Sequence, residues 1–150
     1  MLSDITVIWR LLLSAILSGL IGLERQSARK GAGLRTHILV SLGSCLIMLT
    51  SLRVFDIYKG ITPMDPGRIA AGVITGIGFL GAGTIIRDRE GIRGLTTAAS
   101  LWVVAGIGLS VGIGFYIASM FTTVLALAVL FFLRYFERYL FAGDNRKEIS

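Results

Sequence analysis

Very few residues of this sequence have side chains suited to chemistry. The 150 residues include one histidine, His37, and one cysteine, Cys45. A hydrolytic triad or a metalloprotease site cannot be assembled from them, and no carboxylate pair lies inside a long apolar stretch. We therefore expect no enzyme, no catalytic residues, no metal site and no cofactor. His37 is expected to form hydrogen bonds at an interface rather than to bind a metal.

Three glycines, Gly76, Gly78 and Gly81, have the spacing of a dinucleotide-binding fingerprint. That fingerprint needs a preceding strand and an acidic residue about 20 positions on, which binds the ribose. Here the glycines lie inside the uncharged stretch 69–86, and the acidic position is taken by Val103. Close helix packing is the favoured interpretation, and a backbone unwound around a polar path is the alternative. The predicted packing residues are Gly72, Gly76, Gly78, Gly81 and Gly83.

Glu24 is the most informative charged residue, because it directly follows an apolar stretch. The carboxyl end of a helix disfavours an anion, and charge near hydrocarbon is costly. We therefore expect a cation beside Glu24. Arg25, Arg35 and Arg93 reach the same membrane face, and Arg35 and Arg93 are the favoured candidates. Solvation among lipid headgroups is the alternative.

Two further motifs are typical of helix starts. Asp65 precedes Pro66, and these residues are favoured at the N-cap and the first helical position. Contact of Asp65 and Arg68 with a cation or solute at the outer face is the alternative. Thr96 and Thr97 follow Gly94 and also indicate a helix start, although their hydroxyls could line a polar path.

The long uncharged stretches indicate an all-α integral membrane protein. The chain is 54% hydrophobic with a mean hydropathy of +0.78, more than one soluble core of this size can bury. The uncharged stretch 94–133 would form a helix of about 60 Å, twice the hydrocarbon core, so it must fold back. We predict a single transmembrane domain over 1–150, a bundle of about five transmembrane helices near 5–23, 36–52, 66–86, 95–111 and 115–133, with a tail over 134–150.

The basic residues predict the orientation. An outside amino end places eleven of the fifteen lysines and arginines on the cytoplasmic side, which the positive-inside rule favours. The carboxyl end is then cytoplasmic. Trp102, inside the fourth span, is expected to pack within the bundle. The net charge of +6 is attributed to anionic lipid, and no nucleic-acid partner is expected.

Five ordered blocks resemble the membrane domain of the bacterial MgtC/SapB family over roughly residues 10–120. The blocks are Gly22-Leu-Glu24-Arg25, Ala32-Gly33-Leu-Arg35-Thr36-His37, Arg68-Ile-Ala-Ala, Gly76-Ile-Gly78-Phe79-Leu-Gly81-Ala-Gly83 and Arg93-Gly94-Leu-Thr96-Thr97-Ala98-Ala99-Ser-Leu-Trp102. The resemblance implies an inner-membrane protein associated with magnesium limitation, ion homeostasis and virulence. It also implies a polar cluster of Glu24, Arg25, Arg35, Thr36, His37, Arg93, Thr96 and Thr97, whose individual roles the resemblance does not fix.

Two functions remain open from the sequence. The best-known family member is thought to act on the proton-driven ATP synthase, so the resemblance implies a regulator that binds another membrane complex. A transporter or channel for a cation or small solute is the alternative. A transporter should have ionisable groups near the bilayer midplane, and this sequence places none there. The expected partners are membrane lipids and another membrane protein, with a homo-oligomer also open. Longer family members carry a soluble carboxyl-terminal domain, and we expect this chain to be a short form.

Overall fold

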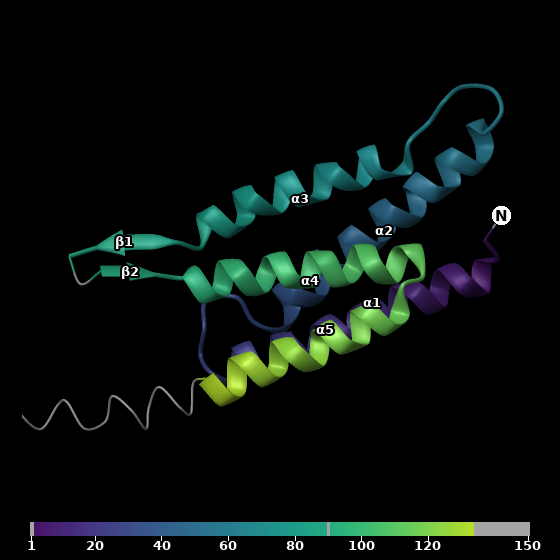
Figure 1. Ribbon diagram of the computed structural model, residues 1–150. Coiled ribbons are helices and arrows are strands. Elements are labelled where there is room, and N and C mark those ends of the chain that lie inside the picture. Colours follow the sequence, from purple (N-terminus) through teal and green to yellow (C-terminus); the bar gives the residue numbers. More distant parts are fainter. Residues whose placement is uncertain (1, 90, 134–150) are drawn as a thin grey trace, which may run out of the picture.

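The computed structural model describes residues 2–89 and 91–133, which form a helical bundle with one short β-hairpin (Figure 1). The elements are α1 (Asp4–Ser27), α2 (Leu34–Tyr58), α3 (Pro66–Gly83), β1 (Ile86–Asp88), β2 (Gly91–Arg93), α4 (Leu95–Ile113), α5 (Tyr116–Ala128) and a π-helical segment, Val129–Leu133. Successive helices run in opposite directions. The loop 28–33, the hairpin and Leu133 therefore lie at one end, which we call the hairpin end. The first residues, the loop 59–65 and the turn after α4 lie at the other, the N-terminal end.

Local sequence explains where the helices begin and end. The Asp65 carboxylate accepts a hydrogen bond of 2.8 Å from the Gly67 N–H, and Pro66 occupies the first turn of α3. The N-cap prediction for Asp65 is therefore confirmed. Gly94 joins the hairpin to α4 with a φ of 92°, which favours glycine. Gly114 ends α4 with a φ of 97°.

The predicted helices are all present, but several of their ends differ. Helix α1 continues to Ser27 and α2 to Tyr58, beyond the predicted ends at 23 and 52. The third span was expected to reach residue 86, but α3 ends at Gly83 and Ile86 begins the first strand of a hairpin that the sequence analysis did not predict. The strands pair antiparallel, with Ile86 opposite Arg93. The fifth predicted span divides into α5 and the π-helical segment. The predicted tail 134–150 lies outside the described residues.

Length and composition allow four of the described helices to cross a membrane. They are α1, α2, α4 and the continuous helix Tyr116–Leu133. Helix α3 is not among them, because its six glycines and Arg68 lower its mean hydropathy. It nevertheless runs the length of the bundle beside α2 and α4 (Figure 1). The prediction of an all-α integral membrane protein is confirmed, with five bundle helices and four clear candidate spans.

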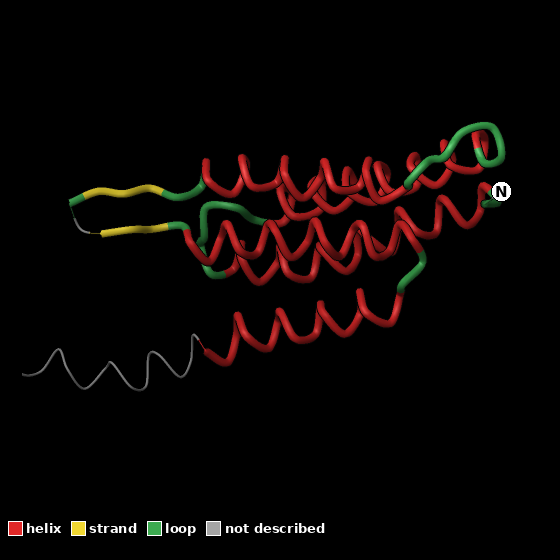
Figure 2. Tube along the Cα trace, turned by 45° about the horizontal axis from the view of Figure 1, so that its top comes forward, coloured by secondary structure: helices red, strands yellow, loops and turns green. Residues whose placement is uncertain are grey.

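Three helices, α1, α2 and α4, form the centre of the bundle. Leu17, Ile21, Cys45, Val104 and Val111 pack together between them. Helix α3 lies on one flank against α2 and α4, and α5 lies on the other against α4 and α1 (Figure 2). Large apolar side chains cover the outer surface, as expected for helices that face lipid.

The closest helix packing involves glycines of α4 rather than those of α3. A Cβ on Gly108 would lie 2.9 Å from the Ser44 Cβ, and one on Gly112 would lie 2.7 Å from the Met48 Cβ. Both glycines therefore let the backbone of α4 touch α2. Of the five α3 glycines predicted to pack, only Gly81 meets another helix, with its added Cβ 3.6 Å from the Ala98 Cβ. The prediction is wrong within this chain for the other four, Gly72, Gly76, Gly78 and Gly83, which have open space around them.

This packing predicts different outcomes for neighbouring glycines of α4. Gly108→Ala should lower the free energy of unfolding in mild detergent by about 1–3 kcal/mol, because the added methyl must push α2 away. Gly106 has nothing within 4 Å of its Cβ position, so Gly106→Ala is the matched control. It should be neutral or slightly stabilising, since alanine favours a helix. Equal stability of the two variants would contradict the assigned contact.

Candidate functional site

The predicted polar cluster is only partly assembled, at the hairpin end of the bundle. Glu24, Arg25, His37 and Thr97 lie inside it, with Arg25, His37 and Thr97 buried. Ser100 joins them, although the sequence analysis did not single it out. The remaining predicted members are exposed: Arg35, Thr36, Arg93 and Thr96. The cluster is therefore smaller and more enclosed than predicted.

Glu24 forms an ion pair with the residue that follows it. The Arg25 Nε lies 2.6 Å from the Glu24 Oε2, and the two side chains are only 3% and 9% exposed. The expectation of a cation beside Glu24 is confirmed, and this cation is Arg25, which was a candidate but not one of the two favoured. Arg93 lies 3.9 Å from Asp88 across the hairpin. Because the Glu24–Arg25 pair is desolvated, loss of either partner leaves a charge in a poor environment.

Gly22 sets the distance between α1 and α2 at this site. A Cβ there would lie 2.8 Å from the Leu34 Cα and 3.1 Å from the His37 Cβ, so only glycine allows this approach. The Gln26 side chain then accepts a hydrogen bond of 3.2 Å from the Leu34 N–H at the start of α2. These contacts bring the end of α1, which carries Arg25, beside the start of α2, which carries His37.

His37 is fully buried and links α2 to α4. Its Nδ1 lies 2.8 Å from the Gly33 carbonyl oxygen, and its Nε2 lies 3.0 Å from the Ser100 Oγ. The Ser100 hydroxyl is also 2.8 Å from the Thr97 carbonyl oxygen. The prediction that His37 forms hydrogen bonds is confirmed, and its site lies inside the bundle. Groups of three or more potential metal-binding side chains do not occur among residues 2–89 and 91–133.

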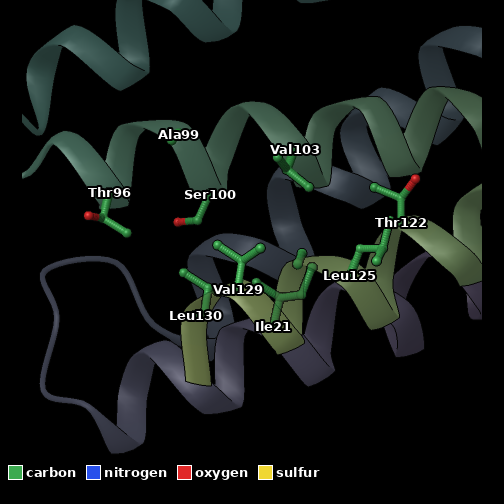
Figure 3. Close-up of a pocket in the computed structure, with 10 residues that line it drawn as sticks. Ile21, Thr96, Ala99, Ser100, Val103, Thr122, Leu125, Val129 and Leu130 are labelled. Atoms are coloured by element: carbon green, nitrogen blue, oxygen red, sulfur yellow. The ribbon is translucent and has the colours of Figure 1, made fainter. Parts of the chain in front are cut away.

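Ser100 also lines a cavity of about 280 Å³ between α1, α4 and α5 (Figure 3). Ile21, Val103 and Leu125 form part of its apolar wall, and Thr96 lies at the edge nearest the hairpin. The methyl group of Thr96 points toward this mainly apolar cavity and its hydroxyl points away, so here Thr96 does not line the polar path considered from the sequence (Figure 3).

A second buried cation lies at the N-terminal end and was missed by the sequence analysis. The Arg10 Nη1 donates a hydrogen bond of 2.7 Å to the Gly112 carbonyl oxygen, and its Nε donates one of 3.0 Å to the Tyr116 hydroxyl. Its guanidinium also lies over the Tyr116 ring, 5.8 Å from the centroid. Arg10 thus ties α1 to the turn between α4 and α5, where the carboxyl end of α4 favours a cation.

Two other predicted positions lie on the surface. Arg68, expected at the outer face, is exposed on the first turn of α3. Trp102 was expected to pack within the bundle, but 53% of it is exposed, so this prediction is wrong. Its side chain lies on the outward face of α4, where an aromatic ring can contact lipid.

Helices with apolar outer surfaces, enclosing buried polar groups at both ends, define a multi-pass membrane protein of the helical type. The chain belongs to the MgtC family, whose family model matches residues 11–139. It is 49% identical over 123 residues to the putative magnesium transporter YhiD of Escherichia coli K12, covering 81% of this chain and 57% of that protein. It is 43% identical over 127 residues to protein MgtC of Salmonella typhimurium, covering 85% and 52%.

An uncharacterised protein of Haemophilus influenzae is 40% identical over 122 residues, covering 79% of this chain and 51% of its own length. The chain thus spans about half the length of the relatives it matches. No solved structure matches it. The match of the family model confirms the family resemblance inferred from the five sequence blocks.

The buried ion pair predicts a large difference between two arginines. Arg25→Met should destabilise the protein by about 3–5 kcal/mol, because it removes one partner of an ion pair whose side chains are nearly inaccessible to solvent. Arg35→Met, at an exposed position, should cost about 1 kcal/mol or less. Unfolding in mild detergent measures both, and Arg25→Met should be non-additive with Glu24→Gln. If the Arg35 variant proves the more damaging, the pairing assigned here is wrong.

Proposed function

We propose that this chain is a regulatory membrane protein that binds another membrane protein through the outer face of α3. We define this face by Gly72, Thr75, Gly76, Phe79 and Gly83, which share one side of the helix at spacings of three, four and seven residues. Phe79 is 83% exposed, and the three glycines have nothing within 4 Å of their Cβ positions. The opposite side of α3 carries its two buried residues, Ile77 and Gly81.

This proposal rests on the spacing of the exposed glycines in α3. Glycine weakens a helix, and in lipid it offers little surface for contact. Gly72 and Gly76 are four residues apart, the same spacing as Gly108 and Gly112, which let α4 touch α2. A glycine pair of this kind on an exposed face therefore suits close approach by a further transmembrane helix.

Transport of a cation is the second candidate, and the name of the E. coli relative, a putative magnesium transporter, favours it. A magnesium path should present carboxylates or carbonyl groups near the midplane of the membrane. The buried side chains in the central part of the described bundle are instead hydroxyls, a thiol and hydrocarbon. This composition supports the regulatory function over transport.

The proposal assigns no catalysis to Ser100 and His37, although their contact has the geometry of a nucleophile and its base. Ser100 is only 5% exposed and lies inside α4. Within a helix the backbone N–H groups already donate to helical carbonyl groups, so they do not supply an oxyanion hole.

Site-specific photo-crosslinking tests the α3 face. A benzophenone amino acid at position 79 should form a crosslink in native membranes to a second membrane protein, identified by mass spectrometry. The same group at Trp102, an exposed aromatic position on α4, is the matched control. Gly76→Leu should abolish the crosslink from position 79 while leaving thermal stability unchanged, since Gly76 has no neighbour within the chain.

Two outcomes would count against this function. Crosslinks to lipid alone at position 79 would indicate a lipid-facing surface, and an unchanged crosslink in Gly76→Leu would show that the glycines do not matter. A crosslink to a second copy of this chain would instead identify a homo-oligomer interface.

We also propose that the amino end lies outside and the hairpin end faces the cytoplasm, in the bacterial inner membrane. Arg25, Arg29, Lys30 and the arginines of the hairpin all lie at the hairpin end, and basic residues favour the cytoplasmic side. A phosphatase reporter that is active only outside should work when inserted in the loop 59–65 and fail when fused after Leu133. The reverse pattern would overturn this orientation.

A further inference from the structure

His37 is the single histidine of the chain. It is fully buried where α1, α2 and α4 meet. The Gly33 carbonyl lies on one side of its ring, and Ser100 of α4 lies on the other. The charged groups that act on the imidazole are Glu24 and Arg25, both on α1, and their charges have opposite signs. His37 is one helical turn from the loop 28–33 at the hairpin end, in which Arg29, Lys30 and Gly31 are exposed.

The Gly33 contact fixes one of the two ring nitrogens. A carbonyl oxygen only accepts hydrogen bonds, so the Nδ1, 2.8 Å from it, must carry a hydrogen. The neutral imidazole then has its lone pair on Nε2. Any proton that His37 gains or loses must therefore be exchanged at Nε2, the atom that faces Ser100.

The Ser100 hydroxyl has one hydrogen and two acceptors within reach. When the imidazole is neutral, Ser100 must donate to Nε2, because that nitrogen has no hydrogen of its own. When Nε2 is protonated, it donates to the Ser100 Oγ, and the hydroxyl hydrogen is released to the Thr97 carbonyl oxygen at 2.8 Å. The site therefore satisfies every hydrogen-bonding group in both protonation states.

We propose that His37 is a proton-binding site and that Ser100 transmits its protonation state to the start of α4. Binding adds one proton to the Nε2 lone pair and breaks no covalent bond. Protonation reverses the hydrogen bond between α2 and α4, because Ser100 donates to neutral His37 and protonated His37 donates to Ser100. The Ser100 hydroxyl then donates to the Thr97 carbonyl. A histidine with a purely structural role needs only one of these two arrangements.

The start of α4 is well placed to respond. Thr97 lies in its first turn, directly after Gly94 and the hairpin, and Ser100 lines the cavity between α1, α4 and α5 (Figure 3). This proposal does not depend on the outer face of α3, which lies on another helix, so either proposal can fail without the other.

Nuclear magnetic resonance of the protein in lipid bilayers tests the proton site directly. Because the chain has one histidine, ¹⁵N-histidine labelling reports on His37 alone. As the pH is lowered from about 8 to about 4, a window that extends below ordinary histidine titration because burial disfavours the imidazolium, Nε2 should change from unprotonated to protonated while Nδ1 keeps its hydrogen. A ring that stays in one protonation state throughout this range would overturn the proposal.

A second label tests the relay through Ser100. Thr97-Ala98 is the single Thr-Ala pair in the sequence, so ¹³C-carbonyl threonine combined with ¹⁵N-alanine isolates the Thr97 carbonyl. Its chemical shift should change with the same pH midpoint as Nε2. Titration of His37 without a change at Thr97 would overturn the relay.

Two variants complete the experiment. Ser100→Ala removes the acceptor of the Nε2 proton, so proton affinity should fall about tenfold or more, since bonds to charged groups are the stronger ones. The Thr97 carbonyl should then stop responding. Ser41→Ala is the matched control, because it also removes a buried hydroxyl that bonds to another helix, in this case to the Ser14 carbonyl. In this variant His37 should titrate as it does in the wild type. Identical titration of the Ser100 variant and the wild type would contradict the assigned role of Ser100.

Discussion

The backbone contact between α2 and α4 is the constraint on which the rest of the structure depends. It exists because Gly108 and Gly112 have no side chain where α4 meets the α2 backbone. A side chain at either position would separate the helices. Since α4 also carries Ser100 and receives the bond from Arg10, the same contact sets the geometry at both ends of the bundle. The apolar core then fills the space around it.

Most buried hydroxyls satisfy their hydrogen bonds within their own helix, which explains how a bundle in lipid can contain so many. Ser18, Ser44 and Thr123 each donate to a carbonyl one turn earlier, so their burial leaves no group without a partner. They act as small packing residues. Three serines of the described bundle instead make bonds between helices: Ser41 donates to the Ser14 carbonyl, Ser51 donates to the Pro66 carbonyl, and Ser100 meets His37. Of these three bonds, the one to His37 involves a group that titrates.

The sequence predicted the helices well because their signals are local, namely uncharged length and capping residues such as Asp65. It failed where a result depends on which face of a helix turns inward. Gly72 and Gly76 have the same spacing as Gly108 and Gly112, and the pattern alone does not distinguish an exposed pair from a buried one. Adjacent side chains on a helix usually point apart, so Arg25 was not preferred as the partner of Glu24. Ser100 had one usable signal, its position one turn beyond Thr97 on the buried stripe of α4.

The two ends of α4 contact basic side chains of different kinds. At its carboxyl end the Gly112 carbonyl accepts from Arg10, whose guanidinium stays charged at every physiological pH. At its amino end Ser100 meets an imidazole, the side chain whose charge changes most readily near neutral pH. A helix held at one end by a permanent charge and at the other by a titratable one can respond to protons only at the second. The fixed contact at Arg10, together with the glycine contacts to α2, therefore confines any proton-dependent movement of α4 to the turns beside the hairpin.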